Sequence, residues 1–409
     1  INVELYVEDM PAFSWETFYL VPAEEQIEAE QADDLVLENE FLHVSLNENG
    51  TLKVHDLEHN KIYDNLLVFE DLGDIGNEYV YKKPNGEEAI LSTNHLSDAK
   101  IGSINAFEKE LVLTHEIEVP LSADEQLDLE QRKVVEFRNR KAQRVEETKT
   151  LEIETTVRLE KEANHLEFST KLTNEMKDHR LRVLFPSSLS SDVHYADSIY
   201  ETVERPNAVS DVWTNPENPQ RTHRFVQVTD GEHGMLVEPD GLNEYEVITE
   251  DEGDLTIAVT LFRSIGEMGD WGYFPTPGAQ CLDRDFEFVY SLSFHGKEDM
   301  EESRKEAIYR HIPLMVSQTD RHEGTLENTG QHLNIEGETV AVTAVKRHRL
   351  TDELITRFYN FSDQESEFLA EYSGLEPMKT TILEREEKPL DDFKAKAFEI
   401  VTLKWKEGE

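Results

Sequence analysis

Residues 148–174 read TKTLEIETTVRLEKEANHLEFSTKLTN, and this stretch decides the fold class. Within it, Leu151, Ile153, Thr155, Val157 and Leu159 occupy every second position, as side chains on one face of a β-strand do. Similar patterns recur along most of the chain, separated by turn signals about every 8–12 residues, with no alternation of strands and helices. The sequence therefore predicts an all-β protein built from β-sandwiches, not a doubly wound sheet or an α/β barrel.

Outward from this stretch, local signals predict a turn, a charged excursion and a helix. Asn49-Gly50 is typical of a type I′ hairpin turn, in which both central residues need positive φ. Residues 122–147 are densely charged, and we interpret them as a solvated excursion or a long edge hairpin. Residues 297–311 are rich in helix formers and end before Pro313, which predicts a connecting helix.

The chain of 409 residues is long enough for two to four domains. A hairpin is expected near the start, with one strand through Val3, Leu5 and Val7 and a second over residues 17–21. Because the chain begins at Ile1 in the middle of such a pattern, we expect it to be a fragment. The predicted organisation is a small β segment with an acidic linker (1–34), a large β-sandwich (35–296), a helical connector (297–316) and a small C-terminal β-sandwich (317–409).

Composition restricts the partners that the chain can have. The 87 acidic and 40 basic residues give a formal net charge of −47, which repels nucleic acids and anionic membrane surfaces. Cys281 is the single cysteine, so an intrachain disulfide is impossible. No apolar run approaches the ~20 residues that span a bilayer. We therefore expect a cytoplasmic protein that binds neither nucleic acid nor membrane.

The histidines and carboxylates do not form a recognisable metal or catalytic motif. His115 and His165 each lie two positions before a glutamate, but zinc needs three or four converging ligands. The sequence contains no H-E-x-x-H and no His-x-Asp. We interpret both pairs as exposed polar strand faces. Glycosidases use two carboxylates, but with 87 acidic residues no pair can be chosen from spacing.

Two loops carry aromatic residues. Residues 69–81 read FEDLGDIGNEYVY, combining glycines, carboxylates and tyrosines that suit sugar hydroxyls and sugar rings, although an ordinary acidic loop would look the same. Residues 271–280 read WGYFPTPGAQ, which we interpret as a packed connection stiffened by proline.

Several segments, in this order and spacing, resemble the C-terminal β-domains of bacterial glycoside hydrolase family 38 α-mannosidases, including the mannosylglycerate hydrolase branch. The resemblance covers nearly the whole chain. The segments are LENEFLHV (37–44), NGTL (49–52), NLLVFED (65–71), GDIGNEY (73–79), DHRLRVLFP (178–186), ERP (204–206), GLNEYEV (241–247), LFRS (261–264), TPGAQ (276–280), VTAVK (342–346) and RFYN (357–360).

The resemblance implies a galactose-mutarotase-like supersandwich with small flanking β-sandwiches. It also implies a retaining, zinc-dependent exo-α-mannosidase whose nucleophile and most zinc ligands lie in an upstream barrel domain. We accordingly expect no catalytic residue and no metal ligand in this chain. Its expected partners are a mannose-containing saccharide or mannosyl conjugate, its own N-terminal catalytic domain, and a second copy of itself in a homo-oligomer.

The resemblance also implies substrate contacts from this chain. Tyr79 should approach the mannose, and Arg205 should lie near the aglycone. Asp74 and Glu78 should contact hydroxyls or position Tyr79, although Asp74 could instead cap the loop backbone. Two other functions remain open from the sequence: a stand-alone carbohydrate-binding β-sandwich, and a purely structural or oligomerisation module.

Overall fold

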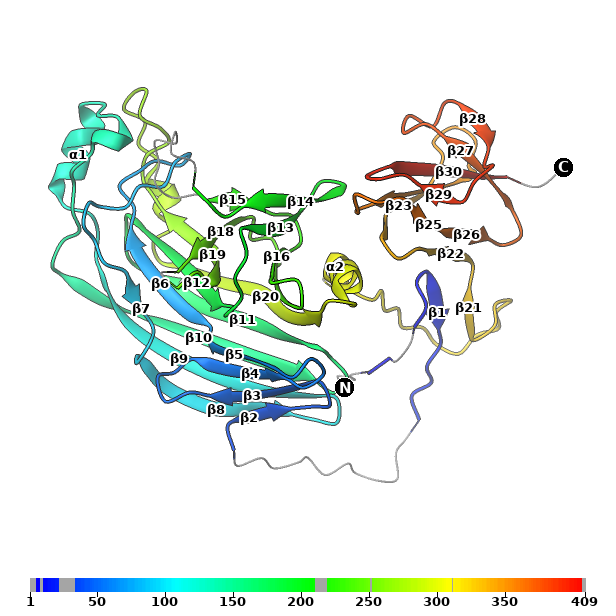
Figure 1. Cartoon of the computed structure of the whole chain (residues 1–409), viewed down its shortest axis with the longest axis horizontal. Coiled ribbons are helices and arrows are strands. Elements are labelled where there is room, and N and C mark those ends of the chain that lie inside the picture. Colours follow the sequence, from blue (N-terminus) through cyan, green and yellow to red (C-terminus); the bar gives the residue numbers. More distant parts are fainter. Residues whose placement is uncertain are drawn as a thin grey trace. The chain divides into compact units, whose positions relative to one another are not determined.

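The computed structural model describes residues 5–7, 10–21, 34–209, 219–250, 252–310 and 312–406. Backbone contacts divide the chain into two compact units (Figure 1). The large unit comprises residues 29–196 and 204–297, and the small unit comprises residues 1–28, 197–203 and 298–409. The predicted all-β class, with a large β-sandwich and a smaller one, is confirmed, whereas the exact domain limits stay a prediction.

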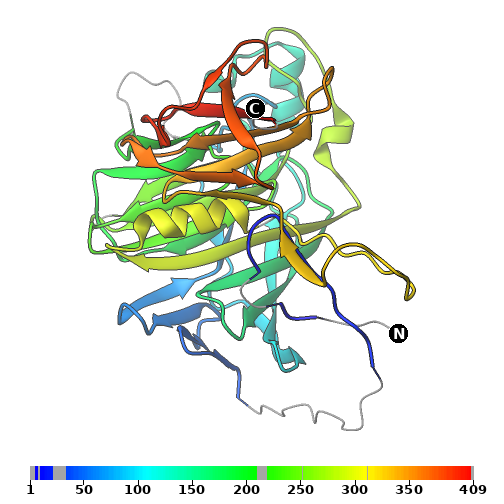
Figure 2. The ribbon, with the colours of Figure 1, turned by 90° about the vertical axis from the view of Figure 1, so that its right-hand side faces the viewer.

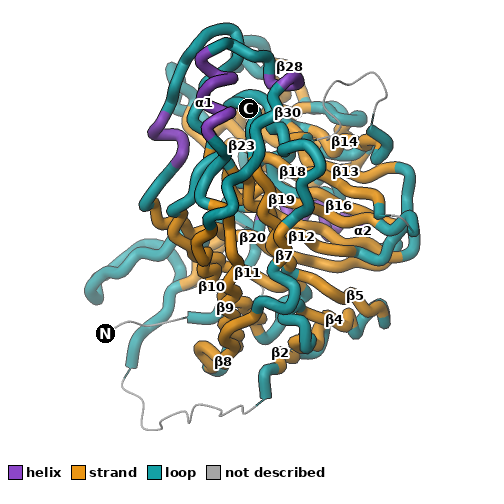
Figure 3. The backbone as a smooth tube through the Cα atoms, turned by 90° about the vertical axis from the view of Figure 1, so that its left-hand side faces the viewer, coloured by secondary structure: helices purple, strands orange, loops and turns teal. Residues whose placement is uncertain are grey.

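The largest sheet is nine-stranded, and residues 148–174 form two neighbouring strands inside it, β10 (Thr148–Glu160) and β11 (His165–Asn174), which lie between β20 (Arg284–Gly296) and β9 (Glu108–Pro120) (Figure 3). Residues 148–160 form one strand that pairs along its whole length with residues 108–120, and Leu151, Ile153, Thr155, Val157 and Leu159 are all buried. In spatial order its strands are β14 (Glu201–Pro206), β13 (Val193–Ser198), β16 (Val226–Thr229), β17 (His233–Pro239), β20 (Arg284–Gly296), β11 (His165–Asn174), β10 (Thr148–Glu160), β9 (Glu108–Pro120) and β8 (Leu96–Ile104).

Two further antiparallel sheets complete the large unit. The six-stranded sheet carries the loop expected to meet substrate, immediately after its strand β6. Its order is β15 (Gln220–Arg221), β18 (Glu244–Thr249), β19 (Leu255–Ser264), β12 (His179–Pro186), β6 (Val68–Gly73) and β7 (Ile90–Leu91). The four-stranded sheet has the order β2 (Val36–Glu38), β3 (Leu42–Leu46), β4 (Leu52–Asp56) and β5 (Lys61–Leu66).

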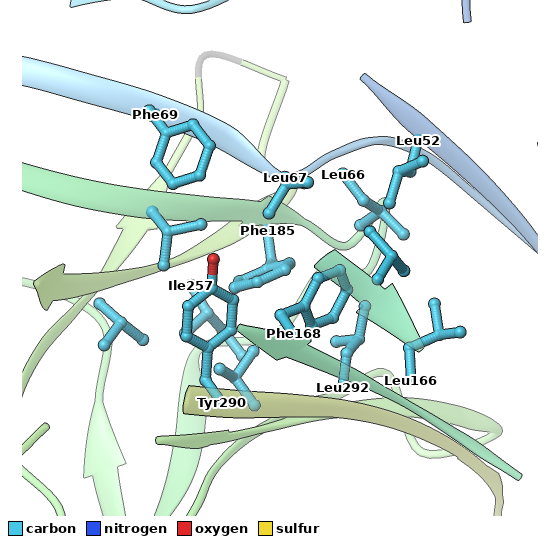
Figure 4. Packing of buried hydrophobic residues seen from close by; sticks show 14 of the residues in the cluster. Leu52, Leu66, Leu67, Phe69, Leu166, Phe168, Phe185, Ile257, Tyr290 and Leu292 are labelled. Atoms are coloured by element: carbon cyan, nitrogen blue, oxygen red, sulfur yellow. The ribbon is translucent and has the colours of Figure 1, made fainter. Parts of the chain in front are cut away.

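One hydrophobic core is shared by these three sheets (Figure 4). Phe168 of β11 and Tyr290 of β20 stack with ring centroids 5.3 Å apart, and Phe185 of β12 contacts both rings. All three rings are completely buried. Burial of each such side chain stabilises the fold by about 1.5–3 kcal/mol, so the alternating pattern of the sequence is the main source of the sandwich.

The small unit, whose C-terminal strands are drawn in orange and red in Figure 2, has a core of its own around Phe358 and Trp405. The predicted helix is present as α2 (Met300–Tyr309), and the hydroxyl of Tyr309 accepts a hydrogen bond from the Val342 amide at 2.6 Å. The strands of this unit are β1 (Ser14–Glu16), β21 (Thr329–Gln331), β22 (Leu333–Glu336), β23 (Val340–Arg347), β24 (Leu354–Asn360), β25 (Ser366–Glu367), β26 (Leu369–Tyr372), β27 (Glu376–Thr380), β28 (Glu387–Pro389), β29 (Lys394–Ala395) and β30 (Ile400–Lys406).

Three local expectations are corrected by the structure. Residues 5–7 and 17–21 form no strand; β1 pairs instead with β21, while Val3 lies outside the described residues. The hairpin at residues 47–51 is present, but only Gly50 has positive φ (+84°), so the turn is not type I′. The charged patch contains the helix α1 (Glu125–Arg132) and the 3₁₀ turn η1 (Phe137–Asn139), at the top of Figure 1.

No helix among the described residues is both long and apolar enough to cross a membrane.

Candidate functional site

The loop that follows β6 is organised by the carboxylate of Asp74, which is completely buried. One oxygen of Asp74 accepts hydrogen bonds from the Gly76 amide (2.9 Å) and the Lys82 amide (3.3 Å). The other oxygen accepts hydrogen bonds from Nε (2.8 Å) and Nη2 (2.7 Å) of Arg263 on β19. Every part of the Asp74 carboxylate is thus used inside the protein, so this residue holds the loop and is turned away from solvent.

A second guanidinium, which is completely buried, holds the same loop. Arg140, immediately after η1, donates from Nη1 to the carbonyl oxygens of Ile75 (3.1 Å) and Gly76 (2.5 Å). Its Nη2 forms an ion pair with Glu267, and both side chains are essentially inaccessible to solvent. The Glu267 carbonyl in turn accepts the Glu78 amide at 3.0 Å. Burial raises the pKa of Glu267, and the charge of Arg140 opposes that shift.

Tyr79 lies at the tip of this loop, within a tight turn. The Asn77 side chain accepts hydrogen bonds from the amides of Tyr79 and Val80, both at 3.0 Å, and the Asn77 carbonyl accepts Nη2 of Arg263 at 2.8 Å. The Tyr79 side chain itself is 70% exposed. A fixed backbone therefore presents a solvent-accessible phenol, which is the arrangement that a ligand contact needs.

The second aromatic loop lies directly beside Tyr79. The rings of Tyr79 and Trp271 have centroids 5.5 Å apart, and Trp271 and Phe274 have centroids 5.8 Å apart. Trp271 is 61% exposed and Phe274 is 42% exposed. The interpretation of residues 271–280 as a packed connection is therefore wrong for its first four residues, which bring exposed aromatic rings to the predicted site.

Glu78 borders a shallow depression on the outer side of the six-stranded sheet. The depression has a volume of about 450 Å³ and is lined by Glu78, Glu244, Thr260, Arg263, Ile265 and Ala279. Thr260 donates a hydrogen bond to Glu244 at 2.9 Å. Glu78 itself is exposed. The lining is mixed: Ile265 and Ala279 are apolar, and the carboxylates of Glu78 and Glu244 share the depression with the guanidinium of Arg263.

Arg205 has its contacts in a different network of the large unit. Its Nη1 donates to the Tyr245 hydroxyl (2.6 Å) and to the Arg221 carbonyl (2.7 Å). The Tyr245 hydroxyl lies 2.8 Å from Nε2 of His194, whose Nδ1 lies 2.7 Å from Oδ1 of Asn207. The structure shows no contact between Arg205 and Tyr79, so a role of Arg205 near an aglycone stays a prediction.

This network favours the neutral form of His194. Burial lowers the pKa of His194 to about 4, and the charge of Arg205 lowers it further, against the effect of the hydrogen bond to Asn207. The hydrogen bonds suit the neutral ring, because the Tyr245 hydroxyl accepts from Arg205 and can donate its own proton to Nε2, while Nδ1 can donate to Oδ1 of Asn207.

We expect the free energy of unfolding to fall as the pH is lowered from about 6.5 to about 4. In this window the unfolded chain protonates His194 and the folded chain does not, so acid favours unfolding, by up to about 3 kcal/mol. Urea unfolding at a series of pH values measures this slope. His194→Gln should flatten it, whereas the exposed His322→Gln should leave it as it is; an unchanged slope in His194→Gln would contradict the assignment.

Sequence reasoning missed the residues that hold the site together. Arg140 lies in the patch interpreted as solvated, yet it is completely buried, and its long-range partner Glu267 gave no signal. His115, interpreted as exposed, is also buried, and its Nε2 lies 2.9 Å from the Gly50 carbonyl. The aromatic composition of residues 271–274 was the one available signal, and it was assigned to packing.

The described residues do not fit a zinc site. Within these parts of the chain, no three His, Cys, Asp or Glu side chains are grouped so that they could hold a metal ion. Structural zinc needs about four ligands and catalytic zinc about three, so the described residues do not by themselves supply a complete zinc site.

Comparison with known proteins gives the family. Residues 37–267 match the model of the glycosyl hydrolases family 38 C-terminal domain, and residues 339–403 match the family 38 C-terminal beta sandwich domain. A protein of Halalkalibacterium halodurans named putative mannosylglycerate hydrolase is 34% identical over 407 residues, which cover 96% of this chain and 44% of that protein.

Two solved structures from Enterococcus faecalis agree with this result. One, described as an alpha-mannosidase, is 39% identical with a TM-score of 0.90, covering 98% of this chain and 46% of that one. The other, described as a protein in the glycosyl hydrolase family 38, is 38% identical with a TM-score of 0.86, covering 94% and 45%. The chain thus spans less than half the length of these relatives. It belongs to glycoside hydrolase family 38 and corresponds to the C-terminal β-domains of that family.

Proposed function

We propose that this chain is the C-terminal, non-catalytic region of a cytoplasmic, retaining exo-α-mannosidase that removes terminal α-mannosyl groups. In this proposal an upstream barrel domain carries the nucleophile and a zinc ion. The chain completes the substrate site by presenting the loop of residues 74–80. The observation that carries the proposal is the exposed Tyr79 ring on a backbone fixed by the buried Arg140 and the partly buried Arg263, in a chain that matches two family 38 domain models.

The chain's own residues would bind and orient the substrate. The Tyr79 hydroxyl can donate to a sugar oxygen, and its ring can pack on the apolar face of a sugar. Glu78 is exposed and can accept hydrogen bonds from hydroxyl groups. Asp74 is committed to Arg263 and to backbone amides, so its proposed role is to position Tyr79. Zinc would supply Lewis-acid chemistry in the upstream domain, and the described residues take no part in holding it.

The test is hydrolysis of an aryl α-mannoside by the full-length enzyme with zinc. Tyr79→Phe removes one hydroxyl from the proposed site, and we expect kcat/KM to fall at least about tenfold, as for one lost hydrogen bond that strengthens in the transition state. Tyr19→Phe is the matched control, because Tyr19 is 65% exposed and its hydroxyl bonds only Asn328 in the small unit. If Tyr79→Phe is as active as the wild type, the Tyr79 hydroxyl does not contact the substrate.

A stand-alone carbohydrate-binding protein is the second candidate, and the exposed rings of Tyr79, Trp271 and Phe274 favour it. The two candidates differ in what the chain does without an upstream domain. A completing region should show no turnover and little affinity for mannose alone. Calorimetric binding of mannose by residues 1–409 in the micromolar range would favour the second candidate. Turnover of the aryl mannoside by these residues would contradict both.

A further inference from the structure

Four exposed aromatic side chains from two loops make up what we call the aromatic platform: Tyr79, Trp271 and Phe274, whose rings contact one another in turn, and Tyr273, which precedes Phe274 in the sequence. Their exposed fractions range from 39% for Tyr273 to 70% for Tyr79. Exposed aromatic residues grouped in this way cost free energy in water, and such groups mark binding surfaces in soluble proteins.

The platform is a built feature, because two glycines make room for its rings. A Cβ on Gly269 would lie 1.9 Å from the Trp271 ring, and a Cβ on Gly272 would lie 2.5 Å from the Phe274 ring. Each ring therefore rests on bare backbone. Across the loop, the Met268 amide donates to the Phe274 carbonyl at 3.0 Å.

The platform is also supported from the charged segment of residues 122–147. The carboxylate of Asp270 accepts the Phe137 amide of η1 at 2.8 Å. The guanidinium of Arg132, at the end of α1, lies 5.2 Å from the Tyr273 ring centre. Arg132 also bonds Asp128 at 2.6 Å, so its charge is already matched. The loop that bears the rings is thus fixed at both sides, and its rings are held in place before a ligand arrives.

The charges around the platform select against an anionic ligand. Glu78 and Asp270 lie in the same two loops as the platform. Three arginines that contact these loops or their rings are each paired with a carboxylate: Arg140 with Glu267, Arg263 with Asp74 and Arg132 with Asp128. The faces of aromatic rings carry negative potential as well. A neutral pyranose, whose C–H groups form an apolar face, fits this surface better than a carboxylate.

We propose that the aromatic platform binds the leaving-group sugar, so that the preferred substrates are mannosides of a neutral saccharide rather than of a small anion such as glycerate. This inference rests on the proposed function, because it places the mannosyl group at Tyr79. Trp271, with its ring centre 5.5 Å from that of Tyr79, then meets the next residue of the substrate. Trp271 and Phe274 are specificity-determining residues in this arrangement.

The experiment compares three substrates with the full-length enzyme: an α-linked mannobiose, mannosylglycerate and methyl α-mannoside. We expect the wild type to prefer mannobiose to mannosylglycerate by at least about tenfold in kcat/KM. In Trp271→Ala, the ratio of kcat/KM for mannobiose to that for methyl α-mannoside should fall about five- to tenfold, as expected for one lost stacking contact. Trp271→Phe should restore most of that ratio, and Ile62→Ala, at a 48% exposed position on β5, should not change it.

The outcomes separate this inference from the proposed function. Suppose that mannosidase activity depends on Tyr79 but Trp271→Ala does not change the ratio of kcat/KM for mannobiose to that for methyl α-mannoside. The platform then does not bind the leaving-group sugar, and the proposed function still holds. A preference for mannosylglycerate would also overturn the inference. Trp271→Ala could instead lower the melting temperature of the full-length enzyme by several degrees and reduce kcat/KM equally for all three substrates. That result would overturn the inference and assign the platform to a contact with the upstream domain. No turnover of any substrate would contradict the proposed function itself.

Discussion

Replacing Arg140 with methionine is expected to lower the free energy of unfolding of the large unit by about 3–5 kcal/mol, because it leaves a buried carboxylate without its partner. Arg140 is completely buried and bonds four groups: the carboxylate of Glu267 and the carbonyls of Val135, Ile75 and Gly76. Methionine fills much of the same volume but donates no hydrogen bond. All four acceptors then lose a partner that Arg140 supplies.

Urea unfolding followed by circular dichroism measures the effect. The matched control is Arg138→Met, two residues earlier, because Arg138 is 42% exposed and pairs only with the surface residue Glu136. Surface pairs of this kind contribute about 0–1 kcal/mol. Similar stability losses in the two variants would show that Arg140 acts by general charge and not through its buried contacts.

A second variant tests the cause within the pair. Glu267→Gln removes the buried charge, so Arg140→Met combined with Glu267→Gln should be more stable than the sum of the two single losses predicts. The expected coupling is about 1–3 kcal/mol, in the range measured for residues in direct contact. Additive losses would contradict the ion pair as the source of the stability.

The strands could be predicted because each carries its own signal. In residues 148–160 the side chain of every second residue is buried, so the pattern reports directly which face meets the core. The helix α2 was found in the same way, from a local run of helix formers. Such features depend on residues that are close in the sequence, so they can be predicted without knowing which strand pairs with them.

The site could be predicted only as far as its exposed residue. Tyr79 was found through resemblance, but the elements that fix it come from three distant segments: Arg140 follows η1, Arg263 lies on β19 and Glu267 begins the platform loop. Charged side chains in a polar patch normally face solvent, so a buried Arg140 contradicts the usual expectation. Only the tertiary fold brings these charged side chains together, so no local sequence pattern predicts their contacts.

The arrangement also explains why a mostly acidic chain buries arginines at this place. Where the chain leaves the end of a strand and enters a loop, its carbonyl groups are no longer bonded by a neighbouring strand. Each of these carbonyl groups needs a hydrogen-bond donor if it is buried. One guanidinium offers five N–H donors in a plane, so two arginines can serve several carbonyls and carboxylates at once. The backbone at Tyr79 is therefore held rigidly, and it loses less conformational entropy when a ligand binds than a free loop would.

Gly76→Ala is expected to reduce the mannosidase activity of the full-length enzyme by about 100-fold, the size of loss that a 1 Å misplacement can cause. A Cβ on Gly76 would lie 2.0 Å from the Val80 carbonyl oxygen, closer than real Cβ contacts ever come. This clash is with backbone, so no side-chain rotation relieves it. The turn closed by hydrogen bonds between Asn77 and Val80 must open, and Tyr79 lies inside that turn.

The measurement is kcat/KM with an aryl α-mannoside, together with thermal unfolding to confirm that the fold is retained. Gly278→Ala is the matched control, because a Cβ there meets nothing within 4 Å and its φ is not positive. We expect Gly76→Ala to lose activity while keeping its β-sheet circular dichroism, since only the loop beyond β6 has to move. Full activity in Gly76→Ala would mean that the backbone at Tyr79 need not be fixed for catalysis. Arg140 and Arg263 would then serve stability alone, and the proposed contact between Tyr79 and the mannosyl group would lose its structural basis.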